Sequence, residues 1–362
     1  MEPYSPGRRT ALLFCGTGAH GAYQAGVLRG LQEAGVKVDV VAGQGIGAAT
    51  AALAAIDGGA RLWDADGVWR GTGAPGLYRW KRALVVAGWL LVLLGLVAVM
   101  AAMLAAGGYA LSPAVSAAAG LLALASVGVL AGAVVVDRVR TPAARRATGP
   151  WWWRLAGAPL DARGARELVV DAIWGLIRGA APLTRPDRLA LGRRYSEVLA
   201  ESLGQPGFRE LLIVTHDLDT RRDVVATLLG DAYRHEFMAR RPGRERRAEA
   251  LDLAGVGRDH AIDIVCGALS LQVGTDPYLL TFGADTYWRG ETHRCVDRPG
   301  GVARVLEELY AAGVSQVIVV SAVAVAAGPH RLTSPGLDLR RRLGEAAASA
   351  EAAAVRDAIE QA

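Results

Sequence analysis

The first 55 residues alternate between apolar runs and glycine-rich turns in the order typical of an α/β sheet. The apolar run Leu12 to Cys15 leads into the segment GTGAHG at 16–21, and apolar residues then recur at helical spacing from Tyr23 to Leu31. Gly35 is placed to cap that helix, and Val36 to Val41 predict a second buried strand. The segment GQGIG at 43–47 then predicts a sharp turn into a small-residue helix. Both helix N-termini should therefore lie at one sheet edge, where N–H groups and helix dipoles can hold an anion.

Two long uncharged stretches interrupt this pattern after a further helical stretch at 61–69. Residues 83–108 and 114–136 contain no charged side chain, and each exceeds the roughly 20 residues needed to cross a bilayer. We predict a two-span transmembrane hairpin; the alternative is a helical pair buried in a globular core. Small residues such as Ala101, Ala105 and Gly108 would allow a homo-oligomer or a membrane-protein partner to form through the hairpin.

The flanks of the hairpin predict its orientation. Basic residues stand outside both spans, at 79, 81 and 82 before the first and at 138, 140, 145 and 146 after the second. The positive-inside rule therefore places both outer ends in the cytoplasm, at the inner membrane surface. Tryptophans at 80 and 151–153 fit interfacial anchors, with core packing as the alternative for the triple run.

From Asp161 the pattern returns to that of a soluble domain. It predicts helices at 166–177, 195–203, 261–271 and 302–312, strands at 209–215, 224–229, 292–297 and 316–321, and a peripheral C-terminal helix at 339–362. We predict one α/β domain with a mainly parallel sheet, interrupted by the hairpin. Its first half spans 1–78, the hairpin with its flanks 79–155, the second half 156–335, and the C-terminal helix 336–362.

Composition narrows the range of functions. Hydrophobic residues make up 52% of the 362 residues, the net charge is +5, and only two of the 40 basic residues are lysines. No basic run is interleaved with aromatic residues, so we expect no nucleic acid partner. The basic segment 240–247 is either a solvated surface or a contact for lipid headgroups. The first ten residues have no apolar core, so no signal peptide is expected.

The cysteines and histidines predict neither a metal nor a cofactor. Cys15, Cys266 and Cys295 are widely spaced, which argues against a disulfide framework and a zinc site. The histidines at 235, 260, 293 and 330 lack metal-ligand spacing. His216 and Asp217 are adjacent on a predicted strand, so their side chains should point to opposite faces rather than form a catalytic pair.

The N-terminal stretch resembles the signature of the patatin-like phospholipase family. The family's glycine loop G-G-G-x-R-G is matched at Gly16, Gly18 and Gly21, its helix motif G-x-Y-Q-x-G-V-L at 21–28, and its elbow G-x-S-x-G at Gly43 and Gly47. The segment 215–222 also resembles the middle of patatin-like domains. The resemblance implies a three-layer α/β domain in which a Ser-Asp dyad hydrolyses lipid esters. It also implies that the loop residues Gly16, Thr17, Gly18, His20 and Gly21 hold the oxyanion.

Several positions depart from the family pattern. Gly45 stands where the family has its nucleophilic serine, and His20 stands where the loop has arginine. Asp297 matches the dyad aspartate, but Arg298 and Pro299 follow it in place of two small residues. Arg298 is placed to pair with the Asp297 carboxylate and lower its basicity. Thr50, Cys15 and Cys266 are interpreted as structural residues, not as substitute nucleophiles.

Two functions follow from this reading. The first is a membrane-anchored pseudoenzyme, a lipase-like domain that binds membrane lipid or a partner protein without turnover. The alternative is an active lipid acyl hydrolase in which the serine at position 45 has been replaced. We favour the first, because His20, Arg298 and Pro299 also depart from the pattern, whereas a single replacement would change position 45 alone.

Overall fold

The computed structural model describes residues 3–57, 59–65, 67–71, 76–109, 113–140, 157–240, 248–286, 288–322 and 339–361. These residues form two compact units, one of residues 79–161 and a larger one of residues 1–78 and 162–362. Some features of the sequence prediction lie outside the described residues: the tryptophans at 151–153, Arg145, Arg146, His330 and residues 241–247 of the basic segment.

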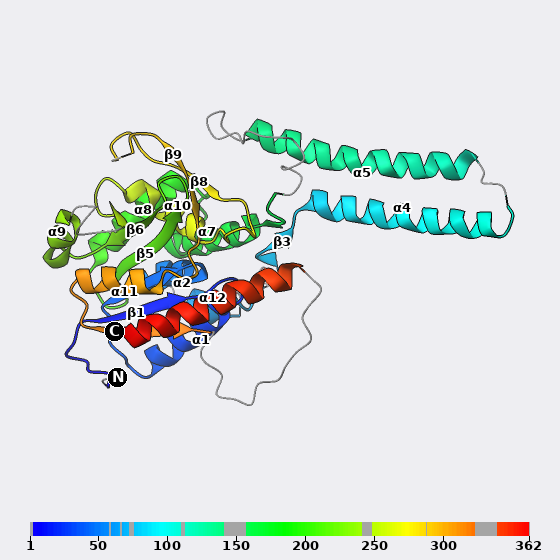
Figure 1. Cartoon of the computed structure of the whole chain (residues 1–362). Helices are drawn as coiled ribbons and strands as arrows, with labels where there is room; N and C mark the ends of the chain where they lie inside the picture. The colour runs from blue at the N-terminus through cyan, green and yellow to red at the C-terminus, as the bar shows by residue number, and fades with distance from the viewer. Residues whose placement is uncertain are drawn as a thin grey trace. The chain divides into compact units, whose positions relative to one another are not determined.

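An eight-stranded sheet forms the centre of the larger unit (Figure 1). Six strands follow the order β10 (Gln316–Ser321), β1 (Thr10–Cys15), β2 (Val40–Gln44), β5 (Glu210–Asp217), β6 (Arg222–Leu228) and β7 (Ala248–Asp252). The first four run parallel, β6 is antiparallel to β5, and β7 is parallel to β6. Two further strands, β8 (Tyr278–Thr281) and β9 (Thr292–Val296), join antiparallel at the end of β5. The predicted α/β class with a mainly parallel sheet is confirmed.

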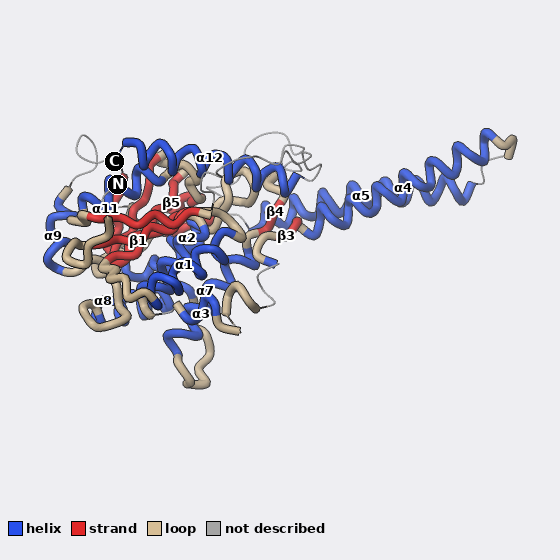
Figure 2. Tube along the Cα trace, turned by 90° about the horizontal axis from the view of Figure 1, so that it is seen from below, coloured by secondary structure: helices blue, strands red, loops and turns tan. Residues whose placement is uncertain are grey.

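Helices cover both faces of this sheet (Figure 2). The alternation of side chains along the strands gives two separate apolar cores, one on each face. Leu12, Phe14 and Val41 face the first core, which is covered by α1 (His20–Glu33), α2 (Ile46–Ala55), α7 (Arg163–Arg178), α8 (Arg188–Ser202) and α10 (Ala261–Ala268). Leu13 and Ala42 face the second core, which is covered by α9 (Asp231–Ala239), α11 (Val302–Ala311) and α12 (Leu339–Gln361). All ten residues of α2 are buried, which explains why that helix is built from small side chains.

Some boundaries differ from the prediction. β2 begins at Val40 instead of Val36, because Asp39 closes the preceding loop by accepting a hydrogen bond from Thr10 N (2.9 Å). The helix expected at 61–69 is only α3 (Ala60–Trp63), since the chain turns back and Val68 N donates to Arg61 O (2.8 Å). The short elements β7, β8 and α9 were not predicted.

The smaller unit contains two long helices, α4 (Arg82–Ala106) and α5 (Pro113–Arg140), which pack side by side, and a short antiparallel pair, β3 (Arg79–Trp80) with β4 (Leu160–Asp161). Both helices are long and apolar enough to cross a membrane. Their side chains are largely exposed within the unit; Leu96 is 61% and Leu124 71% exposed. A helical pair inside a globular core would instead be mostly buried, so the exposure argues against that alternative.

The larger unit holds together the two points where the chain leaves it and returns. Leu77 O accepts a hydrogen bond from Ala165 N (3.0 Å), and a Cβ on Gly164 would lie 2.4 Å from Gly76 O. Residues 79–161 are therefore inserted between two segments that are already in contact.

Candidate functional site

Gly45 connects β2 to α2 in the backbone conformation of a nucleophile elbow. Its φ is 57° and its ψ is −132°, a combination that strains any residue other than glycine. The flanking glycines permit close packing at the turn, because a Cβ on Gly43 would lie 2.2 Å from Gly47 O and a Cβ on Gly47 would lie 2.1 Å from Phe14 O. The elbow is therefore present as a backbone shape, but its central residue has no side chain.

The glycine loop lies directly against this turn, as predicted. Gly16 and Gly18 both have positive φ angles, and the Gly16 carbonyl oxygen accepts a hydrogen bond from Ile46 N (2.9 Å). A Cβ on Gly45 would lie only 2.3 Å from the same oxygen. In elbow enzymes the N–H after the nucleophile helps to bind the oxyanion. Here that N–H is used by the loop, and the loop carbonyl lies where a serine side chain would begin.

Asp297 follows β9 and reaches the elbow from the other side. It is 1% exposed, and its carboxylate oxygens lie 2.9 and 3.1 Å from the position of a Cβ on Gly45. Neither oxygen has a hydrogen-bonding partner of good geometry in the described part of the chain. Burial raises the pKa of Asp297 well above its usual value; the nearby N–H of Arg298 opposes this shift and the charge of Glu351 adds to it. The structure thus brings Gly45 and Asp297 together.

The expectation that Arg298 pairs with Asp297 is wrong. The Arg298 guanidinium pairs with Asp223, a 2% exposed carboxylate on β6. Arg304 Nε lies 3.6 Å from the same carboxylate. The cation next to Asp297 in sequence is therefore directed toward β6, and only its backbone N–H acts on Asp297.

Glu351 is the residue of this region that the sequence interpretation missed. It lies on α12, is 0% exposed, and accepts a hydrogen bond from Ser321 Oγ at Oε1 (3.1 Å). Its Oε2 lies 3.6 Å from His20 Nδ1, which also accepts a 3.4 Å hydrogen bond from Thr17 N. One signal was available, since Glu351 interrupts the apolar face of the predicted C-terminal helix.

Two residues of the helix motif, Gln24 and Gly21, have packing roles. The Gln24 amide donates to Cys15 O (2.8 Å) and accepts from Thr50 Oγ1 (2.7 Å), so it ties α1 to β1 and α2. A Cβ on Gly21 would lie 2.0 Å from the Trp69 ring, so that ring lies directly on the glycine. Thr50 therefore has a structural partner.

The remaining candidate residues are either buried thiols or side chains with partners away from the elbow. Burial raises the pKa of Cys266 to about 12 and that of Cys15 well above its usual value, so neither thiol is ionised near neutral pH. His216 Nδ1 contacts Asp223 (2.8 Å), whereas Asp217 contacts His293 (2.5 Å), as expected for side chains on opposite faces. In the described ranges no three histidine, cysteine or acidic side chains are grouped as metal ligands.

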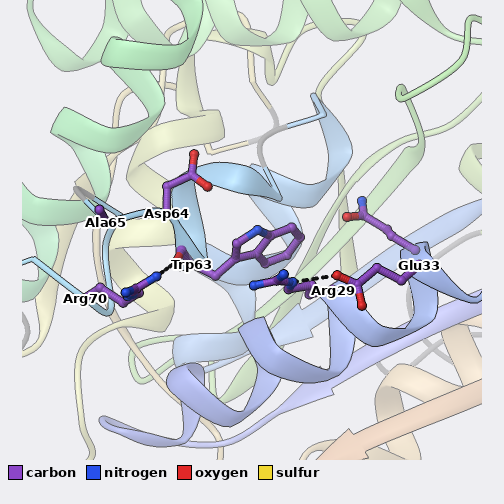
Figure 3. A pocket seen from close by; sticks show the side chains of 7 residues that line it. Arg29, Glu33, Trp63, Asp64, Ala65 and Arg70 are labelled. Atoms are coloured by element: carbon purple, nitrogen blue, oxygen red, sulfur yellow. Dashed lines mark hydrogen bonds and ion pairs between the residues drawn. The ribbon is translucent and has the colours of Figure 1, made fainter.

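Two cavities lie away from the elbow. One of about 310 Å³ surrounds Trp63, where Arg29 Nε donates to Glu33 (2.7 Å) (Figure 3). Its lining is Arg29, Gln32, Glu33, Trp63, Asp64, Ala65 and Arg70. The other, of about 670 Å³, lies at the amino ends of the parallel strands and is lined in part by Arg9, Asp39 and Glu210. Neither lining includes the glycine loop, Gly45 or Asp297.

Comparison with known proteins gives weak similarity. No family model matches the chain, and no curated protein matches its sequence. The solved structure of VipD from Legionella pneumophila is similar over 81% of this chain and 46% of its own, at 13% identity and a TM-score of 0.29. That of the type III effector protein ExoU is similar over 98% of this chain and 54% of its own, at 17% identity and a TM-score of 0.26. The chain spans about half the length of these two proteins.

The buried carboxyl of Asp297 predicts a pH dependence of stability. Between the usual pKa of an aspartate and the raised pKa of Asp297, the folded chain binds more protons than the unfolded chain. The free energy of unfolding should therefore fall as the pH rises through this window and level off above it. Asp297→Asn should remove this fall, which is about 1.4 kcal/mol for each unit by which the pKa is raised. Urea unfolding of both proteins from pH 4 to pH 8 measures it; parallel curves would contradict the burial of an ionisable Asp297.

Proposed function

We propose that this chain is a membrane-anchored, patatin-like domain without hydrolytic turnover, which binds lipid or a partner protein at the inner membrane surface. The proposal combines the sequence resemblance of residues 16–47, the elbow conformation of Gly45, and two exposed apolar helices. The basic residues at 79, 81 and 82 support a cytoplasmic position for the domain.

The main observation that supports the absence of turnover is the position of the Gly16 carbonyl oxygen. It lies 2.3 Å from where a Cβ on residue 45 would stand, and it accepts the N–H of Ile46. Covalent ester hydrolysis needs a nucleophile, a base and free donors for the oxyanion. Position 45 provides no nucleophile, and one of the expected donors is already used.

The same distance argues against the alternative of an active hydrolase that has lost only its serine. A single replacement by glycine would leave the space of the missing side chain open beside the loop. Here the Gly16 carbonyl oxygen and the Asp297 carboxylate fill that space. The loop and position 45 therefore fit each other as they are.

Hydrolysis by the purified full chain in detergent tests the proposal. With a short-chain chromogenic ester and with phospholipid vesicles, we expect the rate of the full chain to equal that of Asp297→Asn and of the detergent blank. Turnover that Asp297→Asn abolishes would establish an active enzyme that uses this aspartate. Turnover that survives the change would contradict both the proposal and the role of Asp297.

Lipid binding needs a separate readout. In nanodiscs that contain a photoactivatable phospholipid, we expect labelled peptides from the larger unit in addition to residues 82–140. Labelling confined to 82–140 would contradict lipid binding by the domain and leave the partner protein as its ligand.

A further inference from the structure

Helix α12 carries a single buried carboxylate in the middle of an apolar face. Counting in steps of three or four residues, this face contains Leu343, Ala347, Glu351, Val355 and Ala358. Val355 and Ala358 pack on the second core, next to the strand side chains of β1 and β10. A glutamate at the centre of such a face is unfavourable for packing, because an ionised carboxylate loses its hydration there. Packing alone therefore does not account for a glutamate at this position.

The strands place Glu351 over the carboxyl ends of β1 and β10. Cys15 and Ser321 are register partners at the ends of these strands, and Ser321 Oγ donates to Glu351 Oε1 (3.1 Å). Glu351 also acts electrostatically on Cys15 and on Asp297. The helix therefore covers the same sheet edge at which the glycine loop, Gly45 and Asp297 meet.

The carboxyl groups at this edge are poorly compensated. Both oxygens of Asp297 and Oε2 of Glu351 lack hydrogen-bonding partners of good geometry in the described residues, and both side chains are 1% exposed or less. The backbone N–H groups of Arg298 and Gly45 act on Asp297, and His20 Nδ1 lies 3.6 Å from Glu351 Oε2. The other titratable groups that face them are Cys15 on β1, His20 at the start of α1 and the buried Tyr78. Only His20 among these can carry a positive charge, so two ionised carboxylates would repel each other here.

We propose that α12 is a displaceable plug, which closes the elbow site through Glu351 and opens as Asp297 becomes charged in its presence. This device goes beyond the proposed function, since it concerns access to the site and not turnover.

The direction of the pH effect follows from linkage. In the closed state, burial and the charge of Glu351 both raise the pKa of Asp297, and displacing α12 would remove the contribution of Glu351. Within this pH window the closed state binds more protons than the open state, so opening becomes more favourable as the pH rises and then levels off. Low pH therefore holds the plug in place.

Cys15 provides a native reporter of opening. It is 0% exposed beside Glu351, whereas Cys266 and Cys295 are equally buried in the first core. The experiment is alkylation of the full chain in detergent with N-ethylmaleimide at pH 5.5 and pH 8.5, followed by mass spectrometry of each cysteine peptide. The ratio of Cys15 to Cys295 labelling removes most of the intrinsic effect of pH on thiol reactivity.

We expect this ratio to rise about tenfold from pH 5.5 to pH 8.5. A tenfold change corresponds to a difference of one unit in the pKa of Asp297 between the closed and the open state. Glu351→Gln preserves the shape of the side chain but not its charge, so it should keep the ratio low at both pH values. Glu360→Gln on the exposed side of α12 is the matched control and should behave as the unmodified chain. A ratio that does not change with pH, or that rises equally in Glu351→Gln, would overturn the proposal.

A second variant acts in the opposite direction. Ala358→Arg places a charge where the helix is 3% exposed, so it should raise Cys15 labelling already at pH 5.5. Cys266 and Cys295 should stay protected in that variant. Equal exposure of all three cysteines would indicate global unfolding and would refute a local plug.

Discussion

Gly45→Ser should fail to create a hydrolase and should destabilise the protein. The new Cβ would overlap the Gly16 carbonyl oxygen at 2.3 Å, and a serine would also have to adopt a φ of 57°. Overpacking against backbone and residence at a positive φ together lower the free energy of unfolding by about 2–4 kcal/mol. Urea unfolding measures this loss, and ester hydrolysis by the same sample should stay at the blank rate.

Two control variants separate the cost of the Cβ overlap from the cost of backbone strain at a positive φ. Gly45→Ala adds the Cβ without the hydroxyl and should cost nearly as much stability as Gly45→Ser. Gly35→Ser has a φ of 67° but no atom within 4 Å of its Cβ, so it isolates backbone strain and should cost only about 1 kcal/mol. Strong hydrolysis by Gly45→Ser would mean that the loop yields to the side chain and that the glycine is a single lesion in a working lipase. If hydrolysis appears only when His20→Arg, Arg298→Gly and Pro299→Gly are added to Gly45→Ser, these three departures from the family pattern also contribute to the loss of activity.

Excising the proposed membrane hairpin should release the chain from the membrane fraction without unfolding the α/β domain. Leu77 O and Ala165 N are already hydrogen-bonded at 3.0 Å, so about four glycine and serine residues can join Tyr78 to Ala162. The shortened chain should leave the membrane pellet after a carbonate wash and migrate as a folded species in gel filtration without detergent. Its melting temperature should stay within a few degrees of the full chain, since the larger unit keeps both cores.

A full-length control tests whether the apolar character of α4 and α5 accounts for the proposed membrane integration. Leu96→Lys with Leu124→Lys changes two exposed side chains, one in each helix, and leaves the packing between α4 and α5 untouched. At the centre of a span each charge costs about 2.5–3.5 kcal/mol, so this variant should also lose membrane integration. If the excised chain stays in the washed pellet, residues 79–161 are not the membrane anchor.

The local parts of the site were predictable from the sequence. The glycines at 16, 18, 43 and 47 mark turns whose geometry depends on neighbouring residues, so strand, loop, helix and elbow were placed correctly. The meeting of Gly45 with Asp297 depends instead on the register of β9 against β5. Only the family resemblance, not the pattern of residues, pointed to that contact.

Two errors have physical causes in tertiary structure. Arg298 was expected to pair with its sequence neighbour, but a buried carboxylate on another strand, Asp223, attracts its guanidinium more strongly. Glu351 was missed because the C-terminal helix was predicted to be peripheral. Its burial follows from where α12 packs, and helical spacing alone does not reveal which face of a helix meets the sheet.

The inserted hairpin also constrains the order in which the protein assembles. β1 and β2 are synthesised before residues 79–161, whereas β5 and β10, their other partners in the sheet, follow afterwards. Closing a flexible loop of that length costs about 4 kcal/mol by the logarithmic loop-closure relation. The pairing of Arg79 with Asp161 and the packing of α4 on α5 bring the two ends together in advance. A hairpin that forms first would therefore bring the two halves of the sheet together. A ribosome stalled before residue 210 would hold β1 and β2 with their outer edges unpaired.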